Sequence, residues 1–234
     1  MIQPEASKRF WNRAARENAA WHIATGYTTE SAEFFASGAR EVDTFLSFAG
    51  LKLRGDERLL EIGSGVGRMT RRLAELAGSV VATDVSDEML SRARTNLADL
   101  PNVSYVEVSG EGDLPVPDAS VDAVFSYITM QHVPTAQAQE RYFAEALRVL
   151  APGGWALIQF RRGGVVPRML DWVGHVWHLL RGRRTLSRAW RGARVAENTL
   201  RRHPSGDVTV DILPLGRRHI WVLARRSGGG ALVR

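Results

Sequence analysis

Short apolar runs alternate with amphipathic stretches through the middle of the chain. Five runs have the length and composition of buried strands, at 58–62, 79–84, 103–108, 121–128 and 155–160. Between them, apolar residues recur at helical spacing, at 67–77, 86–99 and 137–150. Such alternation is typical of a parallel sheet with helices on both faces, because each right-handed crossover packs back onto the sheet. We therefore predict a doubly wound α/β core.

Two helices are predicted before this core, and a β-hairpin after it. Residues 5–20 carry a partly apolar stripe that ends before Gly26, and a second helix begins after Ser31, a residue type that caps helices. The buried stripe of the second helix is predicted to use Phe34, Phe35, Val42, Phe45, Leu46 and Phe48. Near the end of the chain, runs 207–213 and 219–225 flank a Pro-Leu-Gly-Arg-Arg turn, which predicts an antiparallel hairpin.

These patterns divide the chain into five segments. They are an N-terminal helical cap or lid (1–50), a ligand-binding core (51–160), an Arg-rich helical insertion (161–205), the closing hairpin of the core (206–226) and a disordered tail (227–234).

Composition excludes several kinds of site. The 234 residues include no Cys, which excludes a disulfide framework, a Cys-ligated zinc site and a thiol nucleophile. The N-terminal stretch is polar, and no apolar run approaches the length of a membrane span. We expect no secretory signal and a cytoplasmic location.

Three glycines, Gly63, Gly65 and Gly67, follow the first predicted strand and open a helix. Glycines at such a joint allow a tight turn and a close approach of a ligand to the backbone. A dinucleotide fingerprint needs G-x-G-x-x-G, but Arg68 stands where its third glycine would be. Glu61, two residues before the turn, suits a cation better than a pyrophosphate. The turn therefore indicates a ligand other than a dinucleotide.

Asp84 ends the next predicted strand, 21 residues after Gly63. A carboxylate at this position can accept hydrogen bonds from both hydroxyls of a ribose. Asp84 could instead cap the following helix, but Ser86 can do so in its place. We therefore favour a ligand contact for Asp84.

Four sequence features in this order resemble the class I S-adenosylmethionine-dependent methyltransferases. They are E-x-G-x-G-x-G, the acid that ends the second strand, "LPVPDASVDAVFS" and "RVLAPGGWALI", and the resemblance covers roughly 45–160 and the final hairpin. It implies an enzyme with a Rossmann-like fold, whose seven-stranded sheet is mostly parallel with an antiparallel last strand. It also implies S-adenosyl-L-methionine as the cofactor.

The resemblance assigns roles to particular residues. The turn from Gly63 through Ser64 and Gly65 to Gly67 would contact the methionyl part of the cofactor, and Glu61 would orient its amino group. Asp84 would bind the ribose hydroxyls, with Val85 packed on the adenine. The remaining contacts would come from N–H groups at Gly110, Glu111 and Gly112, from a carboxylate of Glu111 or Asp113 on the adenine amino group, and from the carbonyl of Tyr127.

Motifs that the chain lacks exclude some classes of methyl acceptor. The chain has no N/D-P-P-Y/F stretch of amino-directed enzymes, no Cys for attack on pyrimidines, and no carboxylate cluster after 121–128 for magnesium. We therefore expect no metal and a small-molecule acceptor methylated on a hydroxyl oxygen, such as a sugar or secondary metabolite. His132 is the candidate general base, with a structural histidine as the alternative. Tyr27 and Gln131 are further candidate substrate contacts, and Trp21 is expected to pack in the core.

Residues 161–203 hold eleven Arg against one Asp and one Glu, and they contribute strongly to the net charge of +6. They would favour an anionic acceptor, nucleic acid, or contact with a membrane surface or a second subunit in a homodimer. We rank the small-molecule acceptor first, with nucleic acid and a peripheral membrane contact below it. The alternative functions are an RNA methyltransferase and a non-catalytic cofactor-binding or interaction protein, with a dinucleotide oxidoreductase last.

Overall fold

A computed structural model describes residues 4–24, 26–161, 192–202, 206–215 and 219–228. Its strands are β1 (Arg58–Ile62), β2 (Ser79–Asp84), β3 (Val103–Glu107), β4 (Val121–Ser126), β5 (Leu150–Arg161), β6 (Val208–Leu215) and β7 (His219–Arg226). Its helices are α1 (Pro4–Ile23), α2 (Ala32–Phe48), α3 (Thr70–Leu76), α4 (Asp87–Asn96), the 3-10 helix η1 (Met130–His132), α5 (Ala136–Val149) and α7 (Gly192–Arg202).

The described strands form one sheet in the order β3-β2-β1-β4-β5-β7-β6. Neighbours from β3 to β5 are parallel, β7 is antiparallel to β5, and β6 is antiparallel to β7. The predicted doubly wound sheet with an antiparallel last strand is therefore confirmed. The chain order reverses between β1 and β4, and in open α/β sheets ligands bind at the carboxyl ends of the strands beside such a reversal.

Helices cover both faces of this sheet because successive strand residues point to opposite sides. Leu59 joins a buried cluster with Val42 of α2 and Leu73 of α3. Its neighbour Leu60 joins the opposite cluster with Phe143 of α5. α7 adds Val195 and Ala196 to the α5 side.

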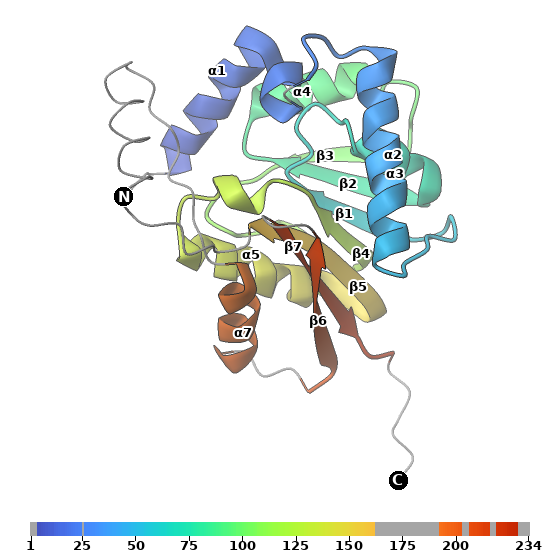
Figure 1. The fold of residues 1–234 in the computed structure, drawn as a ribbon, viewed down its shortest axis with the longest axis vertical. Coiled ribbons are helices and arrows are strands. Elements are labelled where there is room, and N and C mark those ends of the chain that lie inside the picture. The colour runs from blue at the N-terminus through green and yellow to red at the C-terminus, as the bar shows by residue number, and fades with distance from the viewer. Residues whose placement is uncertain (1–3, 25, 162–191, 203–205, 216–218, 229–234) are drawn as a thin grey trace.

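Helix α1 packs beside α4, at the other end of the molecule from α7 and β6 (Figure 1). Four buried alanines of α1 (Ala14, Ala15, Ala19 and Ala20) form a third apolar cluster with Phe34 of α2 and Met89 of α4. This packing places α1 next to the start of α4, directly after β2.

The structure corrects three expectations at helix ends and turns. Asn18 has non-helical backbone angles inside α1, and its side chain accepts a hydrogen bond from the N–H of Trp21 (3.0 Å). A break in the helical period means that the apolar stripe cannot be extrapolated past it, and Trp21 is 48% exposed rather than packed in the core. Phe48, the last residue of α2, is 42% exposed. β5 begins at Leu150 rather than at 155, because Val121 of β4 already pairs with Leu150.

Most of the Arg-rich insertion, and the tail from residue 229, lie outside the described residues. The described part of the insertion includes α7, which is held to α5 by Asn198 and Arg202 on Glu140 (3.0 and 2.5 Å). No helix among the described residues is long and apolar enough to cross a lipid bilayer.

Candidate active site

A pocket of about 970 Å³, counting its open mouth, lies at the carboxyl ends of β1, β2 and β4. Nine of the predicted site residues line it, namely Glu61, Gly63, Ser64, Gly65, Asp84, Val85, Gly110, Tyr127 and His132.

Glycine is required at the first position of the turn after β1. Gly63 has a φ of +80°, and a Cβ built there would lie 2.1 Å from Oγ1 of Thr129. The N–H groups of Gly63 and Ser64 both donate to the carbonyl of Thr83, at 2.8 and 2.9 Å. These two N–H groups are bonded within the protein and are not available to a ligand. The turn can therefore contribute backbone carbonyl groups, and its glycines let a ligand approach the backbone closely.

Asp84 is held in the pocket by two backbone donors. The N–H of Gly65 donates to Oδ2 and the N–H of Ser86 to Oδ1, each at 2.9 Å. Ser86 caps α4 by accepting from the N–H of Met89 (3.1 Å), so the prediction that Asp84 is not the cap is confirmed. Burial raises the pKa of Asp84, and the backbone hydrogen bonds oppose this rise. Each carboxylate oxygen keeps a lone pair for a further donor.

Glu61 is buried at the end of β1, with 3% of its surface exposed. Its Oε2 accepts a hydrogen bond from Oγ1 of Thr70 (2.6 Å). Burial raises the pKa of Glu61 to about 7, the charge of Asp84 adds to this, and Thr70 and Arg68 oppose it. A cation in the pocket would favour the ionised form of this carboxyl group.

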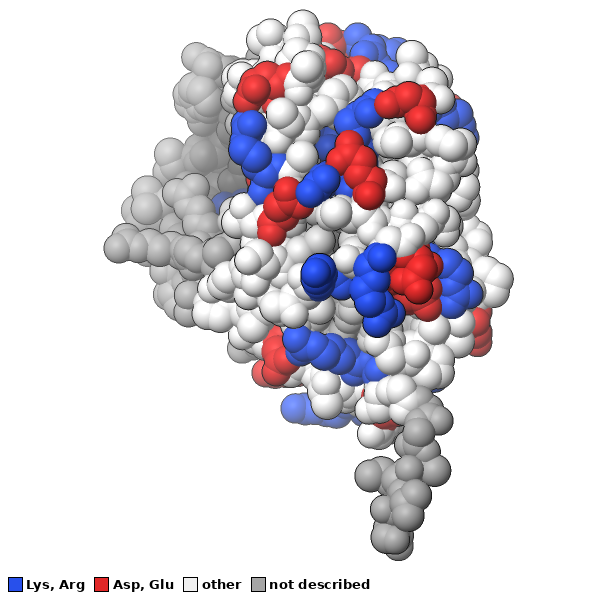
Figure 2. Space-filling view, turned by 90° about the vertical axis from the view of Figure 1, so that its right-hand side faces the viewer, with Lys and Arg blue, Asp and Glu red and all other residues white. Residues whose placement is uncertain are grey.

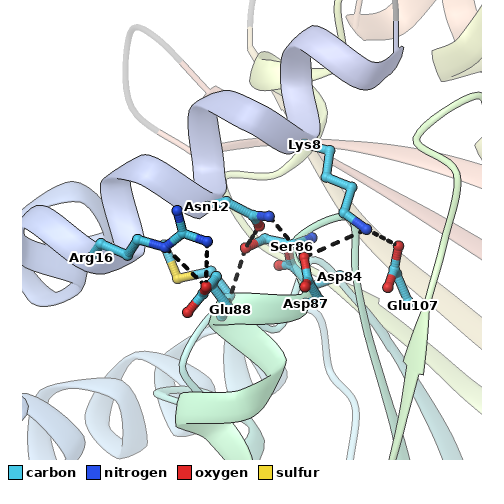
Figure 3. Close-up of polar contacts among 9 residues, drawn as sticks. Lys8, Asn12, Arg16, Asp84, Ser86, Asp87, Glu88 and Glu107 are labelled. Atoms are coloured by element: carbon cyan, nitrogen blue, oxygen red, sulfur yellow. Dashed lines mark hydrogen bonds and ion pairs between the residues drawn. The ribbon is translucent and has the colours of Figure 1, made fainter.

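Helix α1 lies against one side of the pocket through Ser7, Trp11, His22 and Ile23. Three polar side chains spaced four residues apart reach from one face of α1 to α4 and β3 (Figure 3). We call these contacts the α1 clasp: Lys8 to Asp87 (3.5 Å) and Glu107 (2.5 Å), Asn12 to Asp87 (2.8 Å) and Ser86 (2.6 Å), and Arg16 to Glu88 (2.9 Å). The clasp fixes α1 beside the residues that position Asp84.

The other end of the pocket is mainly apolar. Trp11 meets the His132 ring edge-on, with centroids 5.1 Å apart, and Val133 and Pro134 continue this wall. Ile128 has a φ of +59°, a strained conformation for a β-branched residue, and its N–H donates to Oε1 of buried Gln159 (3.2 Å). Strain of this kind is concentrated at functional sites.

Five predicted site residues do not line this pocket. Gly67 abuts Leu97, Gly112 lies against α5, and Glu111 is exposed, with its N–H on Oγ of Ser109 (3.0 Å). Tyr27 packs edge-on against Phe34, with centroids 5.6 Å apart. Gln131 lies beside the pocket, with its Nε2 3.2 Å from Nε2 of His132. Their roles stay predictions.

Sequence reasoning missed several pocket residues. Trp11 and His22 come from a helix that only the fold brings to the pocket, so no local signal marks them. Arg68 also lines the pocket, but the sequence analysis uses it only to exclude a dinucleotide fingerprint. Its position directly after the glycine turn is the local signal that it lies near the ligand. The described residues contain no group of three His, Asp or Glu side chains that could hold a metal ion.

The sheet order, the glycine turn after β1 and the acid at the end of β2 agree with the fold that the resemblance to the class I S-adenosylmethionine-dependent methyltransferases implies. Residues 60–158 match the family described as "Methyltransferase domain".

Curated relatives match the chain over part of its length. It is 34% identical over 104 residues to demethylmenaquinone methyltransferase of Tropheryma whipplei, covering 44% of this chain and 41% of that protein. It is 32% identical over 136 residues to the ubiquinone/menaquinone biosynthesis C-methyltransferase UbiE of Proteus mirabilis, covering 55% and 52%. The chain thus spans about half the length of the curated relatives it matches.

Solved structures also resemble this chain in fold. DhpI in complex with SAH gives a TM-score of 0.62 at 22% identity, covering 96% of this chain and 97% of that one. A methyltransferase-like protein of Bacillus halodurans gives 0.61 at 18% identity, covering 80% and 99%. At these identities the likeness shows the fold.

Proposed function

We propose that the protein transfers a methyl group from S-adenosylmethionine to a small-molecule acceptor. The observation that carries this proposal is that Glu61, the Gly63–Gly65 turn and Asp84 line one pocket. A buried acid suits the cofactor's ammonium group, the turn admits its methionyl chain closely, and Asp84 accepts from the two ribose hydroxyls. When bound, S-adenosylmethionine supplies an electrophilic methyl group on a sulfonium sulfur.

The acceptor is proposed to be a flat apolar molecule with a hydroxyl group. Trp11, Val133 and Pro134 provide the apolar wall, and His132 provides an imidazole in the same part of the pocket. His132 would take the hydroxyl proton while the surrounding apolar side chains exclude water. Alignment of the acceptor by this wall supplies much of the remaining rate, because methyl transfer needs little further chemistry from the protein.

A second candidate is methylation of a ring carbon. The similarity to a relative named as a ubiquinone/menaquinone biosynthesis C-methyltransferase favours it. Removal of a proton from a ring hydroxyl raises the electron density of the ring carbons ortho and para to it. One of these carbons would take the methyl group as the sulfur–methyl bond breaks, and would then lose its own hydrogen as a proton, which restores the aromatic ring. The same imidazole would therefore serve the first deprotonation in either reaction.

An RNA acceptor ranks lower. One face of the molecule shows basic and acidic side chains interspersed rather than a continuous basic stripe (Figure 2). Basic side chains of the described residues are also paired, as Arg72 is with Asp43 (2.9 Å) and Glu75 (3.0 Å). Paired cations contribute little to the counterion release that drives nucleic-acid binding.

Calorimetric titration with S-adenosylmethionine and S-adenosylhomocysteine tests the cofactor, with NADH as the control ligand. We expect both adenosyl ligands to bind, and Asp84→Asn to weaken them by about tenfold or more, because hydrogen bonds to a charged group are lost. The matched control is Asp99→Asn, whose carboxylate pairs with Arg71 on the exposed surface. Preference for NADH, or equal effects of the two variants, would refute the proposal.

A screen of phenols and quinols with isotopically labelled cofactor identifies the acceptor, and NMR of the product separates oxygen from carbon methylation. His132→Gln is expected to lower kcat by about a hundredfold and to leave S-adenosylhomocysteine affinity unchanged. His22→Gln, which removes the other imidazole of the pocket wall, is the control. Near-native turnover of His132→Gln would show that His132 is structural.

A further inference from the structure

The apolar end of the pocket contains a segment that is too short to set its own shape. His132 is the last residue of η1, a 3-10 helix of three residues, and its N–H donates to the carbonyl of Thr129 (2.9 Å). Hydrogen-bond geometry in 3-10 helices is poor, and the carbonyl groups at a helix end need partners from outside the helix. The side chains that bind η1 therefore decide where the imidazole of His132 lies.

One buried side chain provides these partners. Nε2 of Gln139, in the first turn of α5, donates to the carbonyl of Met130 (2.7 Å) and to the carbonyl of Val133 (3.3 Å). The two carbonyls come before and after His132 in the chain. Gln139 is 1% exposed and does not line the pocket, so it can act on a ligand only through the residues that it holds.

The helix behind Gln139 is firmly fixed. Thr135 caps α5, because its Oγ1 accepts from the N–H of Ala138 (3.1 Å), and the N–H of Gln139 donates to the carbonyl of Thr135 (3.2 Å). One turn later, Phe143 is fully buried in the apolar cluster on this face of the sheet. The amide of Gln139 therefore joins η1 to a helix that is anchored in the core.

An amide at this position has a cost to stability. Oε1 of Gln139 is buried and has no hydrogen-bond partner among the described residues. Burial of an unpaired acceptor is unfavourable, and an apolar side chain of the same shape would avoid it. The packing of α5 therefore gives no reason for an amide here, whereas the two hydrogen bonds to η1 do.

We propose that Gln139 is a positioning residue, which holds η1 so that the imidazole of His132 faces the methyl acceptor. This inference rests on the proposed function, in which His132 takes the proton of the acceptor hydroxyl. Proton transfer needs the two groups within hydrogen-bond reach, so a small displacement of η1 lowers turnover. The cofactor residues Glu61 and Asp84 lie on other strands, and their ligand is bound as before.

The variant Gln139→Met tests the inference, because methionine has nearly the same length and shape but no hydrogen-bond donor. Asn102→Leu is the matched control. Nδ2 of Asn102 donates to the carbonyls of Ala74 (2.8 Å) and Ala77 (3.3 Å), so it makes the same pair of bonds. It lies directly before β3, at the opposite end of the strands from the pocket.

Three measurements on the folded variants separate positioning from a purely structural role. The ring of His132 meets Trp11 with centroids 5.1 Å apart, so each ring shifts the NMR resonances of the other. In Gln139→Met the resonances of both rings, assigned with His132→Gln, are expected to move. kcat with an acceptor from the screen is expected to fall by about tenfold or more, and the affinity for S-adenosylhomocysteine is expected to stay unchanged. Asn102→Leu is expected to match the wild type in all three.

Gln139→Glu is the second variant and decides the test if Gln139→Met does not fold. A carboxyl group has at most one hydrogen to donate, where the amide nitrogen has two, so a smaller shift of both rings is expected. Unchanged ring resonances would overturn the inference, and so would shifted resonances with full turnover. An equal loss of S-adenosylhomocysteine affinity and turnover would also overturn it, because Gln139 would then support the whole pocket. If the wild type binds no S-adenosylhomocysteine, the proposed function fails, and the ring resonances still show whether Gln139 positions His132.

Discussion

Replacement of Glu61 by Gln tests whether the pocket holds a neutral carboxyl group near pH 7. The carboxyl group is buried, and its Oε2 accepts a hydrogen bond from the hydroxyl of Thr70, at 2.6 Å. Gln has nearly the same shape, and its carbonyl oxygen can accept from the same hydroxyl. The substitution therefore removes the titration and leaves the packing.

The sign and size of the pH effect on the free energy of unfolding follow from the pKa of Glu61. Burial raises this pKa from 4.5 to about 7 in the folded protein. Between these values the folded state binds a proton that the unfolded state has lost, so the free energy of unfolding falls as the pH rises. The stabilisation is complete below pH 4.5 and is lost above pH 7, and it amounts to about 3 kcal/mol at 1.36 kcal/mol for each pKa unit.

Urea denaturation of both proteins across this pH range measures the effect. The stability of Glu61→Gln relative to the wild type is expected to increase by about 3 kcal/mol between acid and mildly alkaline pH. Burial also raises the pKa of Asp84, and this contribution is common to both proteins apart from its electrostatic coupling to Glu61. Glu111→Gln, which alters an exposed carboxylate, is the control. A pH-independent difference would show that folding does not raise the pKa of Glu61.

Two further predictions concern the glycine turn and the α1 clasp. Gly63→Ala is expected to lose several kcal/mol in urea denaturation, because its Cβ would lie 2.1 Å from Thr129, whereas Gly50→Ala, also at positive φ but in open space, loses about 1 kcal/mol. Equal losses would contradict the steric argument. The double variant Lys8→Gln, Arg16→Gln is expected to release S-adenosylhomocysteine faster in stopped-flow measurements and with less dependence on salt than the wild type. Unchanged release would show that α1 does not close the pocket.

The sequence predicts the core of the fold well because its strands are buried and bounded by turns. The bounds of β1 and β2 agree with the predicted runs 58–62 and 79–84. The roles of Ser31 and Ser86 as helix caps follow from local chemistry alone, and both are confirmed. Local signals suffice where a residue acts on its own neighbours.

The rest of the site depends on residues that are distant in sequence. Asn12 contacts Ser86, 74 residues later, and Ile128 is held by Gln159, 31 residues later. No periodicity or short motif encodes such pairs, because they arise only when separate elements pack.

Helix α1 connects the two ends of the pocket. Its Asn12 contacts Ser86, whose N–H holds Asp84, and its Trp11 packs on His132 at the apolar end of the pocket. We therefore expect a ligand that tightens the region around Asp84 to order the apolar wall as well, because both ends share one docked helix. We expect S-adenosylhomocysteine to slow amide hydrogen exchange in α1 and in η1 together.

The variant Asn12→Ala distinguishes coupling through α1 from direct protection of η1 by the bound ligand. It removes the side chain that joins α1 to Ser86 and Asp87 but leaves Trp11 in the pocket wall. Protection of η1 by S-adenosylhomocysteine is expected to weaken in this variant, whereas protection of the glycine turn persists, because the turn belongs to the ligand's own binding surface. If η1 stays fully protected in Asn12→Ala, the contacts of Asn12 with Ser86 and Asp87 do not couple the two ends of the pocket.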